Sequence, residues 1–240
     1  MSLILPPPKG LRLASYNVRK AVGLDRRRDP GRILDVIAGI GADVVVLQEA
    51  DLRLGARPSA FDPEAIFHRT GLRAVDLDPS SPSLGWHGNA LLVRDGIKVD
   101  MAKGVDLPGL EPRGAILSHL DTPNGPLWLA GAHLGLTRAH RRQQAQALID
   151  YLARDATAPA ALLGDFNEWR KTGALDVLEP QFDVISPGAS FHAAFPVAPL
   201  DRIALGQGLR LNAAGVIDRG PAKRASDHLP IWADVNLGRT

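Results

Sequence analysis

The chain of 240 residues carries 28 Lys and Arg against 26 Asp and Glu and is 45% hydrophobic, which suits one large folded domain and argues against disorder. It has no cysteine, which excludes a disulfide framework, a thiol nucleophile, an iron–sulfur cluster and a cysteine zinc site, so any metal must bind oxygen or imidazole ligands. The formal net charge of +2 is too small to indicate nucleic-acid binding by itself.

The N-terminal residues lack the basic start, long apolar run and small-residue cleavage site of a secretory signal. No window approaches ~18 uninterrupted apolar residues, so no transmembrane helix is expected. We therefore expect a soluble, cytoplasmic protein, and a monomer.

The first fifty residues predict a β-α-β unit. Residues 11–18 have the composition of a strand, and Pro30 opens a helix with isoleucine and leucine at helical spacing that ends at 39–41. Residues 43–47 form a short apolar run, which is typical of a strand buried on both faces.

The middle of the chain is richer in hairpins than in helices. Residues 52–63 are irregular and 78–83 form a loop. The expected elements are a helix at 64–70, strands at 89–93 and 97–102, and a hairpin of 115–120 and 127–133 that turns on Pro123-Asn124-Gly125.

The last hundred residues predict an amphipathic helix followed by short elements. The helix covers 138–154, with Ala145, Leu148, Ile149 and Leu152 on one face. After it we expect a strand at 160–163, a short helix at 173–178, and several short strands that end at 231–235.

Mixed parallel and antiparallel character implies two sheets packed together with helices outside, an α/β fold. No repeat, low-complexity tract or linker divides the chain. The sequence therefore predicts a short N-terminal extension at 1–10 and a single domain at 11–240.

Polar residues suited to catalysis recur just after apolar strands, where open α/β sheets place their sites. Six places show this pattern: Asn17, Gln48-Glu49, His133, Asp165 with Asn167, Asp201, and Asp227-His228.

Each place alone has an ordinary structural explanation. Glu49 could form an ion pair with an arginine, because a buried carboxylate needs a partner. Asp165 and Asn167 could cap a turn. A lone Asp-His pair is usually a surface or capping feature, so a functional His228 requires a distant carboxylate, for which Asp201 is the candidate. His133 could be a satisfied structural histidine.

The set as a whole points to one chemistry. It combines oxygen ligands for a hard cation with imidazoles that could contact phosphate. Metal-assisted phosphoryl transfer to water needs these groups.

Seven segments also resemble, in order, the motifs of the endonuclease/exonuclease/phosphatase superfamily. They are Ser-Tyr-Asn-Val at 15–18, Val-Val-Leu-Gln-Glu at 45–49, Gly-Asn-Ala-Leu-Leu at 88–92, Gly-Ala-His-Leu-Gly at 131–135, Leu-Gly-Asp-Phe-Asn at 163–167, Leu-Asp-Arg-Ile at 200–203 and Ser-Asp-His-Leu-Pro at 226–230. The resemblance implies a four-layer α-β-β-α sandwich, in which two packed mixed β-sheets are flanked by helices and the site lies at one end.

The resemblance also implies a magnesium site. Glu49 matches the principal Mg²⁺ ligand, Asn17 lies nearby, and Asp227 is a further candidate ligand. Mn²⁺ is expected to substitute for Mg²⁺.

The remaining motif residues take catalytic roles by the same resemblance. Asp165 matches the carboxylate that orients or deprotonates the attacking water, and Asn167 the amide that holds that water or a phosphate oxygen. His228, oriented by Asp201, matches the essential histidine, and His133 should donate to a non-bridging oxygen. Family members differ in whether the histidine or the aspartate is the base. We favour Asp165 as base and a protonated His228 as stabiliser of the transition-state charge.

The chain departs from the pancreatic-type deoxyribonucleases at one position. Those enzymes place a glutamate just before the strand that matches 89–93, where it supports the second histidine. Here the stretch reads Trp86-His87-Gly88, which puts a carboxylate partner for His133 in doubt.

The superfamily acts on many phosphoesters, so its motifs predict the reaction and not the substrate. Arg19-Lys20, Arg26 to Arg28 and Arg138 to Arg142 lie on connections from motif-bearing strands, which favours a polyanionic phosphodiester such as nucleic acid, although each run could be a solvated face. We predict a nuclease-like, Mg²⁺-dependent phosphodiesterase with Arg19, Asn89 and Arg138 as substrate-binding residues. The alternatives are a phosphatase, a lipid or inositol phosphodiesterase, and a catalytically silent binding module.

Overall fold

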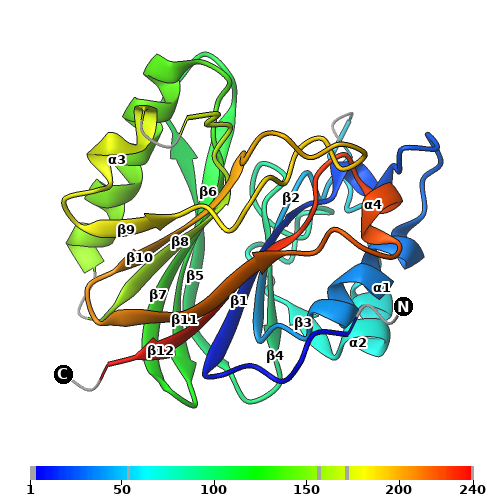
Figure 1. Cartoon of the computed structure of the whole chain (residues 1–240), viewed down its shortest axis with the longest axis horizontal. Coiled ribbons are helices and arrows are strands. Elements are labelled where there is room, and N and C mark those ends of the chain that lie inside the picture. The colour runs from blue at the N-terminus through cyan, green and yellow to red at the C-terminus, as the bar shows by residue number, and fades with distance from the viewer. Residues whose placement is uncertain (1–3, 53–54, 156–157, 171–172, 239–240) are drawn as a thin grey trace.

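Two six-stranded sheets face each other in the part of the chain that the computed structural model describes, which is residues 4–52, 55–155, 158–170 and 173–238 (Figure 1). The first sheet has the order β11-β12-β1-β2-β4-β3, and the second has the order β5-β6-β7-β8-β10-β9. Neighbours β1 and β2 are parallel, as are β7 and β8, and the other pairs are antiparallel. Both sheets are therefore mixed, as the sequence predicted.

The strands of the first sheet are β1 (Leu11–Asn17), β2 (Val44–Gln48), β3 (Leu72–Ala74), β4 (Ala90–Arg94), β11 (Leu209–Val216) and β12 (Ile231–Leu237). Those of the second are β5 (Lys98–Leu107), β6 (Arg113–Thr122), β7 (Gly125–His133), β8 (Ala160–Asp165), β9 (Phe182–Ile185) and β10 (Asp201–Gly206). The helices are α1 (Pro30–Ile40), α2 (Pro63–Thr70), α3 (Arg138–Asp155) and α4 (Ala222–Ala225), with 3₁₀ turns η1 (Arg19–Ala21) and η2 (Ala174–Val177).

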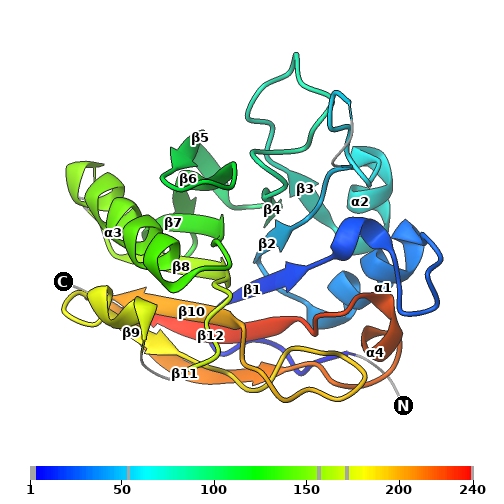
Figure 2. The same ribbon diagram turned by 90° about the horizontal axis from the view of Figure 1, so that it is seen from above.

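The helices cover the outer faces of the two sheets. Helices α1, α2 and α4 lie beside the first sheet, and α3 with η2 lies beside the second (Figures 1 and 2). This arrangement confirms the four-layer sandwich. No helix among the described residues is both long and apolar enough to cross a membrane.

Three buried clusters of apolar side chains hold the layers together. On β2, Val44 and Val46 pack between the sheets, whereas Val45 and Leu47 pack beneath α1. Side chains alternate between the faces of a strand, so a strand covered on both faces must be apolar throughout. The third cluster joins α3 to β7 and β8 and includes the four residues predicted for its buried face.

Local signals explain where the first helix begins and ends. The side chain of Asp29 accepts a hydrogen bond from the Arg32 backbone N–H at 3.0 Å, and Pro30 follows in the first turn. Gly41 ends the helix in the left-handed conformation at φ 63°. These are the start and stop signals that the sequence carries.

Elsewhere the elements differ from those predicted. Strand β3 was missed, because three residues are too few to show a periodic pattern. Strand β5 continues to Leu107, past the predicted end at 102, because it pairs with β6 along its length. The short helix expected at 173–178 is the 3₁₀ turn η2.

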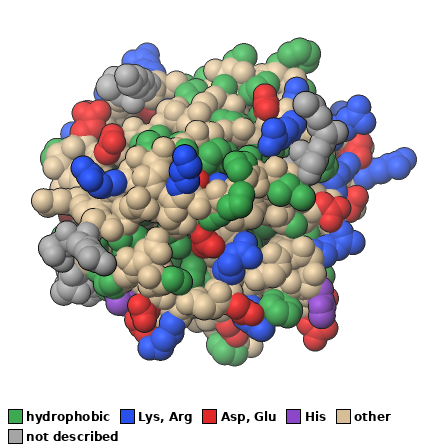
Figure 3. Space-filling view, turned by 60° about the horizontal axis from the view of Figure 1, so that its bottom comes forward, with side chains coloured by type: hydrophobic (Ala, Val, Ile, Leu, Met, Phe, Trp, Pro, Cys, Tyr) green, Lys and Arg blue, Asp and Glu red, His purple; other side chains and the backbone are tan. Residues whose placement is uncertain are grey.

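Charges of both signs are interspersed on the surface. On the face shown in Figure 3, Lys and Arg side chains lie close to Asp and Glu side chains and form no continuous basic field. This distribution agrees with the formal net charge of +2.

Candidate active site

The topology brings the predicted polar residues to the same end of both sheets. In the first sheet Asn17 ends β1 and Glu49 follows the parallel strand β2, while Asp227 precedes β12, which runs antiparallel to β1. In the second sheet His133 ends β7 beside Asp165 on β8, and Asp201 starts the antiparallel strand β10 opposite Asp165. Residues from six separated segments therefore meet where the sheets face each other.

Asp165 lies at the centre of this group. Its Oδ2 accepts a hydrogen bond from Asn17 Nδ2 at 3.0 Å, across the gap between the sheets. The same oxygen lies 3.4 Å from His133 Nε2 and 3.5 Å from His228 Nε2. A carboxylate thus faces His133, although it is not the glutamate of the pancreatic-type deoxyribonucleases.

His228 lies between two carboxylates. Its Nδ1 is 2.9 Å from Asp201 Oδ2, which also accepts a hydrogen bond from Ser190 Oγ at 2.5 Å. The ring of Phe191 packs against the imidazole with centroids 5.0 Å apart. These contacts fix the ring plane, so the orienting role predicted for Asp201 has the required geometry.

The two histidines have pKa values shifted in opposite directions. Burial lowers the pKa of His133 to about 4, and the nearby carboxylate of Asp165 only partly offsets this effect. Burial also acts to lower the pKa of His228, but the charges of Asp201 and Asp165 and the hydrogen bond to Asp201 outweigh it and raise the pKa to about 10. In the metal-free chain His133 is therefore neutral at pH 7, and His228 is protonated.

Asn167 is held beside Asp165 by a tight turn. Its backbone N–H donates to Asp165 Oδ1 at 3.0 Å, and its Nδ2 donates to the Leu134 carbonyl at 2.9 Å. The first contact is the side-chain-capped turn that the sequence left open as an alternative. It leaves the Asn167 side-chain oxygen available to a water or a phosphate.

The loop after Asn167 is anchored by buried charges. Arg202 Nη2 donates to the Glu168 carbonyl at 3.0 Å, and Glu168 Oε2 lies 3.3 Å from Arg141 Nη2. Gln144, also on α3, accepts a hydrogen bond from the Gly135 N–H at 2.7 Å. Arg141 and Gln144 are buried and hold the loops beside the site, so the arginine run that starts α3 is not simply a solvated helix face.

The predicted metal ligands already contact cations of the chain. Glu49 forms an ion pair with Lys20, and Asp227 Oδ2 lies 3.3 Å from Arg19 Nε. Both cations come from the 3₁₀ turn that directly follows Asn17. Glu49 thus has the cationic partner that a buried carboxylate needs. This partner is Lys20, whereas the sequence had suggested an arginine.

These donors suit a hard divalent cation. Glu49 and Asp227 supply carboxylate oxygens and Asn17 an amide oxygen, which are ligands that Mg²⁺ accepts. Among the described residues, the acidic and imidazole side chains that gather closely enough to share one ion are Asp165, Asp201 and His228, whose ligand atoms fall within 4.8 Å of one another, and neither Glu49 nor Asp227 belongs to that group. Asp201 Oδ1 in that group is buried without a hydrogen-bond partner. The chemistry of the residues present therefore fits a metal ion at this end of the sandwich.

Two of the predicted substrate-binding residues, Asn89 and Arg138, lie in environments unlike that of the residues around Asp165. Asn89 is buried, and its Nδ2 donates to the carbonyls of Trp86 and Gly114 at 3.0 and 2.9 Å, so it ties β4 to β6. Arg138 is exposed at the start of α3. The sequence pattern did not distinguish these environments from those of the residues that meet at Asp165.

The backbone is strained at several site residues. Lys20, Glu49 and Asn167 have φ angles of 56°, 52° and 52°, in the left-handed region that residues other than glycine seldom adopt. Such strain persists where the surrounding contacts over-determine the conformation, which is common at functional sites.

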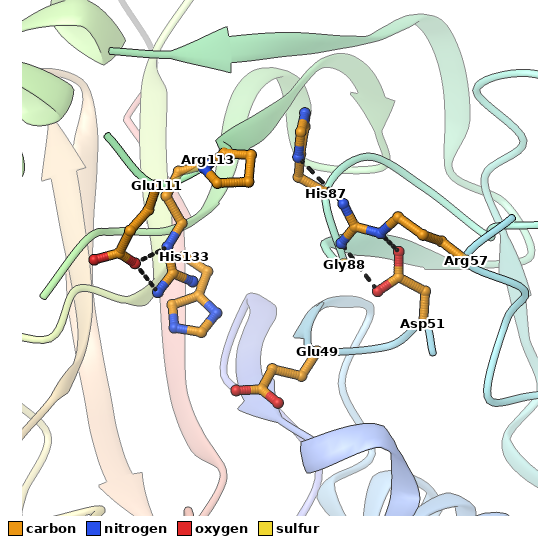
Figure 4. A pocket seen from close by; sticks show the side chains of 9 residues that line it. Glu49, Asp51, Arg57, His87, Gly88, Glu111, Arg113 and His133 are labelled. Atoms are coloured by element: carbon orange, nitrogen blue, oxygen red, sulfur yellow. Dashed lines mark hydrogen bonds and ion pairs between the residues drawn. The ribbon is translucent and has the colours of Figure 1, made fainter. Parts of the chain in front are cut away.

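A cavity of about 290 Å³ opens beside Glu49 and His133 (Figure 4). Its other charged or imidazole-bearing lining residues are Asp51, Arg57, His87, Glu111 and Arg113. Sequence analysis proposed none of them as site residues, since they lie on irregular connections or at a strand start, with no periodicity or motif to single them out.

A sequence model of the Endonuclease/Exonuclease/phosphatase family matches residues 14–228. The chain is 29% identical over 163 residues to YbhP of Escherichia coli (strain K12), an alignment that covers 64% of this chain and 64% of YbhP. The chain thus matches just under two thirds of the length of that curated relative.

Solved structures share the fold at low sequence identity. A mannosyl-6-phosphatase of Bacteroides thetaiotaomicron superposes with a TM-score of 0.72 at 19% identity, covering 94% of this chain and 99% of that one. TDP2 of D. rerio complexed with single strand DNA product superposes with a TM-score of 0.70 at 15% identity, covering 94% and 98%. At these identities the likeness concerns the fold alone.

Proposed function

Since the chain belongs to the Endonuclease/Exonuclease/phosphatase family, we propose that it is a Mg²⁺-dependent hydrolase of phosphoester bonds. The observation that carries the proposal is the environment of Asp165, whose Oδ2 faces Asn17, His133 and His228 at 3.0 to 3.5 Å. These side chains come from both sheets and meet beside the oxygen ligands Glu49 and Asp227. Such a group can hold an attacking water and receive the charge of a phosphoryl transition state.

The geometry of His228 supports the role of charge stabiliser. Both imidazole nitrogens face carboxylates, at 2.9 and 3.5 Å, and both can donate only when the ring is protonated. A cationic imidazole stabilises the negative charge that develops on the phosphoryl oxygens. Asp165 is then the group that accepts the proton of the attacking water.

In the proposed step the water oxygen bonds to phosphorus and gives a proton to Asp165, while the bond from phosphorus to the alcohol oxygen breaks on the opposite side and the leaving oxygen takes a proton from solvent. Asn167 holds the water or a phosphate oxygen, and a neutral His133 donates to a non-bridging oxygen. Glu49, with Asn17 and Asp227, would hold the Mg²⁺ ion, which supplies Lewis-acid stabilisation of the phosphoryl oxygens when bound.

For the substrate, the sequence favours a nuclease-like phosphodiesterase. TDP2 of D. rerio, which has this fold, was solved in complex with a single strand DNA product. Half of the Lys and Arg residues counted for that prediction form ion pairs: Arg19 with Asp227, Lys20 with Glu49, Arg141 with Glu168, and Arg142 with Asp176. Their charge is therefore partly neutralised within the protein.

A second candidate is hydrolysis of a small phosphomonoester. The specific observation in its favour is the cavity of about 290 Å³ beside Glu49, which suits a small group rather than a duplex. The mannosyl-6-phosphatase shows by its name that the same fold serves this reaction.

The test is a panel of esters with the purified protein: supercoiled plasmid, an abasic duplex, bis-p-nitrophenyl phosphate, p-nitrophenyl phosphate and phosphoinositides. Each is assayed with Mg²⁺, Mn²⁺ or chelator, for the wild type, Glu49→Gln, His228→Ala and a control Glu179→Gln at an exposed carboxylate outside the site. We expect the wild type to hydrolyse at least one ester and chelator to abolish this activity. Both site variants should lose the activity, and the control variant should retain it.

Two results would contradict the proposal in different ways. Activity that survives chelation would rule out the metal mechanism. If no ester is hydrolysed and Glu49→Gln binds metal as the wild type does, the remaining alternative is a catalytically silent binding module. Cleavage of monoesters alone would choose the second candidate over the phosphodiesterase.

A further inference from the structure

The cavity beside Glu49 is built from two arginine–carboxylate pairs (Figure 4). Arg57 Nε lies 3.2 Å from Asp51 Oδ2, and Arg113 Nε and Nη2 donate to Glu111 Oε2 at 3.1 and 2.9 Å. In Figure 4 the two pairs lie on opposite sides of the cavity, with Glu49 between them and the imidazole of His133 next to the Arg113 pair. A group that enters the cavity therefore meets donors and acceptors on two sides.

The first pair belongs to a rigid network. Arg57 Nη1 lies 3.4 Å from His87 Nδ1, and His87 Nε2 lies 3.2 Å from Asp106 Oδ1. Next to His87, Gly88 adopts φ 84°, and a Cβ there would lie only 3.0 Å from Asp51 Oδ1. The loop therefore approaches Asp51 closely and supports the Arg57 side of the cavity.

The second pair leaves one edge of its guanidinium for a ligand. Arg113 uses Nε and Nη2 on Glu111 and keeps Nη1 for another acceptor. The charge of Arg113 also acts on His133, since it lowers the pKa of that residue. Arg113 and His133 also line the same cavity, so a ligand bound there can contact both.

The charge balance of the cavity is unfavourable for a second phosphate. Apart from Glu49, the proposed metal ligand, the described lining carries two carboxylates, Asp51 and Glu111, and the two guanidiniums of Arg57 and Arg113. Each guanidinium is already matched by a carboxylate, and an extra anion would be placed against those carboxylates. A neutral group meets no such penalty.

The cavity is small, and its described lining offers no large aromatic ring on which a nucleobase could stack. Ligand cavities in proteins span roughly 300 to 1,000 Å³, so a volume of about 290 Å³ suits a single small ring. Bound bases usually stack on aromatic side chains, and the described lining contains no Phe, Tyr or Trp.

Hydroxyl groups match what the cavity offers. A guanidinium only donates hydrogen bonds and a carboxylate only accepts them, whereas a hydroxyl does both. Neighbouring hydroxyls on one ring can therefore accept from Arg57 or Arg113 and donate to Asp51 or Glu111 at the same time. We propose that the cavity binds the alcohol portion of the substrate and that this alcohol is a ring polyol, such as a hexose or an inositol.

This inference rests on the proposed function, and its test separates the two. Three esters are compared with Mg²⁺: myo-inositol 1-phosphate, a hexose 6-phosphate, and cyclohexyl phosphate, which has the inositol ring size and no hydroxyls. We expect kcat/KM for at least one polyol ester to exceed that for the cyclohexyl ester by about tenfold or more, since hydrogen bonds to charged groups discriminate at this level. The two polyol esters tell inositol from hexose.

Substitutions then locate the preference in the cavity. Arg113→Met, or the more exposed Arg57→Met if the first variant folds poorly, should lower the ratio of polyol to cyclohexyl kcat/KM by about ten- to hundredfold. Arg73→Met is the matched control, because Arg73 also forms an Arg–Asp pair but does not line the cavity. The control should keep the wild-type ratio.

Binding without turnover covers the case in which no ester is hydrolysed. Saturation-transfer NMR on His228→Ala protein should show contacts from the ring protons of myo-inositol 1-phosphate or the hexose ester, lost in the double variant with Arg113→Met. Hydrolysis without polyol preference, or a preference that survives both arginine variants, overturns the inference and leaves the proposed function standing. Preference for thymidine 5′-phosphate p-nitrophenyl ester over the polyols overturns it in favour of a nucleoside. Absence of polyol binding with hydrolysis of another ester in the panel overturns the inference alone, and absence of polyol binding with hydrolysis of no ester overturns both.

Discussion

The side-chain amide of Asn17 donates a 3.0 Å hydrogen bond to Oδ2 of Asp165 and thereby joins the two sheets at the candidate active site. Asn17 ends β1 in one sheet and Asp165 ends β8 in the other, 148 positions later in the chain. Both side chains are buried. The position of the proposed base is therefore set from the opposite sheet.

This contact predicts the effect of Asn17→Asp. The change replaces the donor with a second carboxylate against Asp165, and the like charges repel. We expect kcat to fall by about tenfold or more, since a hydrogen bond to a charged group is lost. The measurement is steady-state hydrolysis of the ester that the panel identifies. The control is Asn212→Asp at an exposed position of β11, and equal activity of the two variants would contradict the prediction.

The ion pair of Lys20 with Glu49 predicts that removal of the lysine charge increases the metal affinity of the site. The Lys20 ammonium contacts the Glu49 carboxylate, so a metal ion at Glu49 must displace or share this partner. Lys20→Met should tighten Mn²⁺ binding by about two- to fivefold, the scale of a partly exposed ion pair. Electron paramagnetic resonance titration of free Mn²⁺ measures this directly. Lys223→Met, at an exposed position of α4, is the control, and unchanged or weaker binding in Lys20→Met would count against the prediction.

The raised pKa of His228 predicts that the stability of chelator-treated protein depends on pH. This pKa is raised to about 10, above the ordinary value of about 6.5, so protonation stabilises the fold. The contribution is fully present below about pH 6.5 and is lost as the pH rises towards 10. Urea unfolding at pH 6 and at pH 9.5 should therefore show a larger loss of stability in the wild type than in His228→Gln. Equal losses would show that the histidine titrates near its ordinary pKa.

The ion pair of Arg12 with Asp234 predicts a stability effect far from catalysis. Arg12 Nε lies 2.6 Å from Asp234 Oδ1, and both side chains are at most 5% exposed. Asp234→Ala leaves the guanidinium buried without its partner, which should cost about 3 to 5 kcal/mol in the free energy of unfolding. Asp95→Ala breaks an exposed pair with Arg73 and should cost less than about 1 kcal/mol. Urea unfolding of both variants checks the comparison.

Much of the fold followed from local pattern. The run at 43–47 indicated a strand covered on both faces, and in the structure β2 packs between the other sheet and α1. The same reasoning placed polar side chains at strand ends. These inferences succeed because alternation, helical spacing and capping act over a few residues.

The contacts within the site followed from no such pattern. Asp165 faces Asn17 and His228 because two sheets pack face to face, and Glu49 meets Lys20 because β1 and β2 are parallel neighbours. The arginine runs looked like a polyanion surface in the sequence, and the fold supplied several of them with carboxylate partners from distant segments.

Residue types and their order along the chain were enough to predict the family and the fold and to propose a metal-assisted hydrolytic chemistry, because the motifs carry their polar residues near strand ends. The cavity beside Glu49 is different, since one of its arginine–carboxylate pairs comes from the connection after β2 and the other from the connection between β5 and β6 and the first residue of β6, and the two meet only after the sheets and loops are packed. Substrate recognition depends on such long-range contacts, so it had to be inferred from the folded chain.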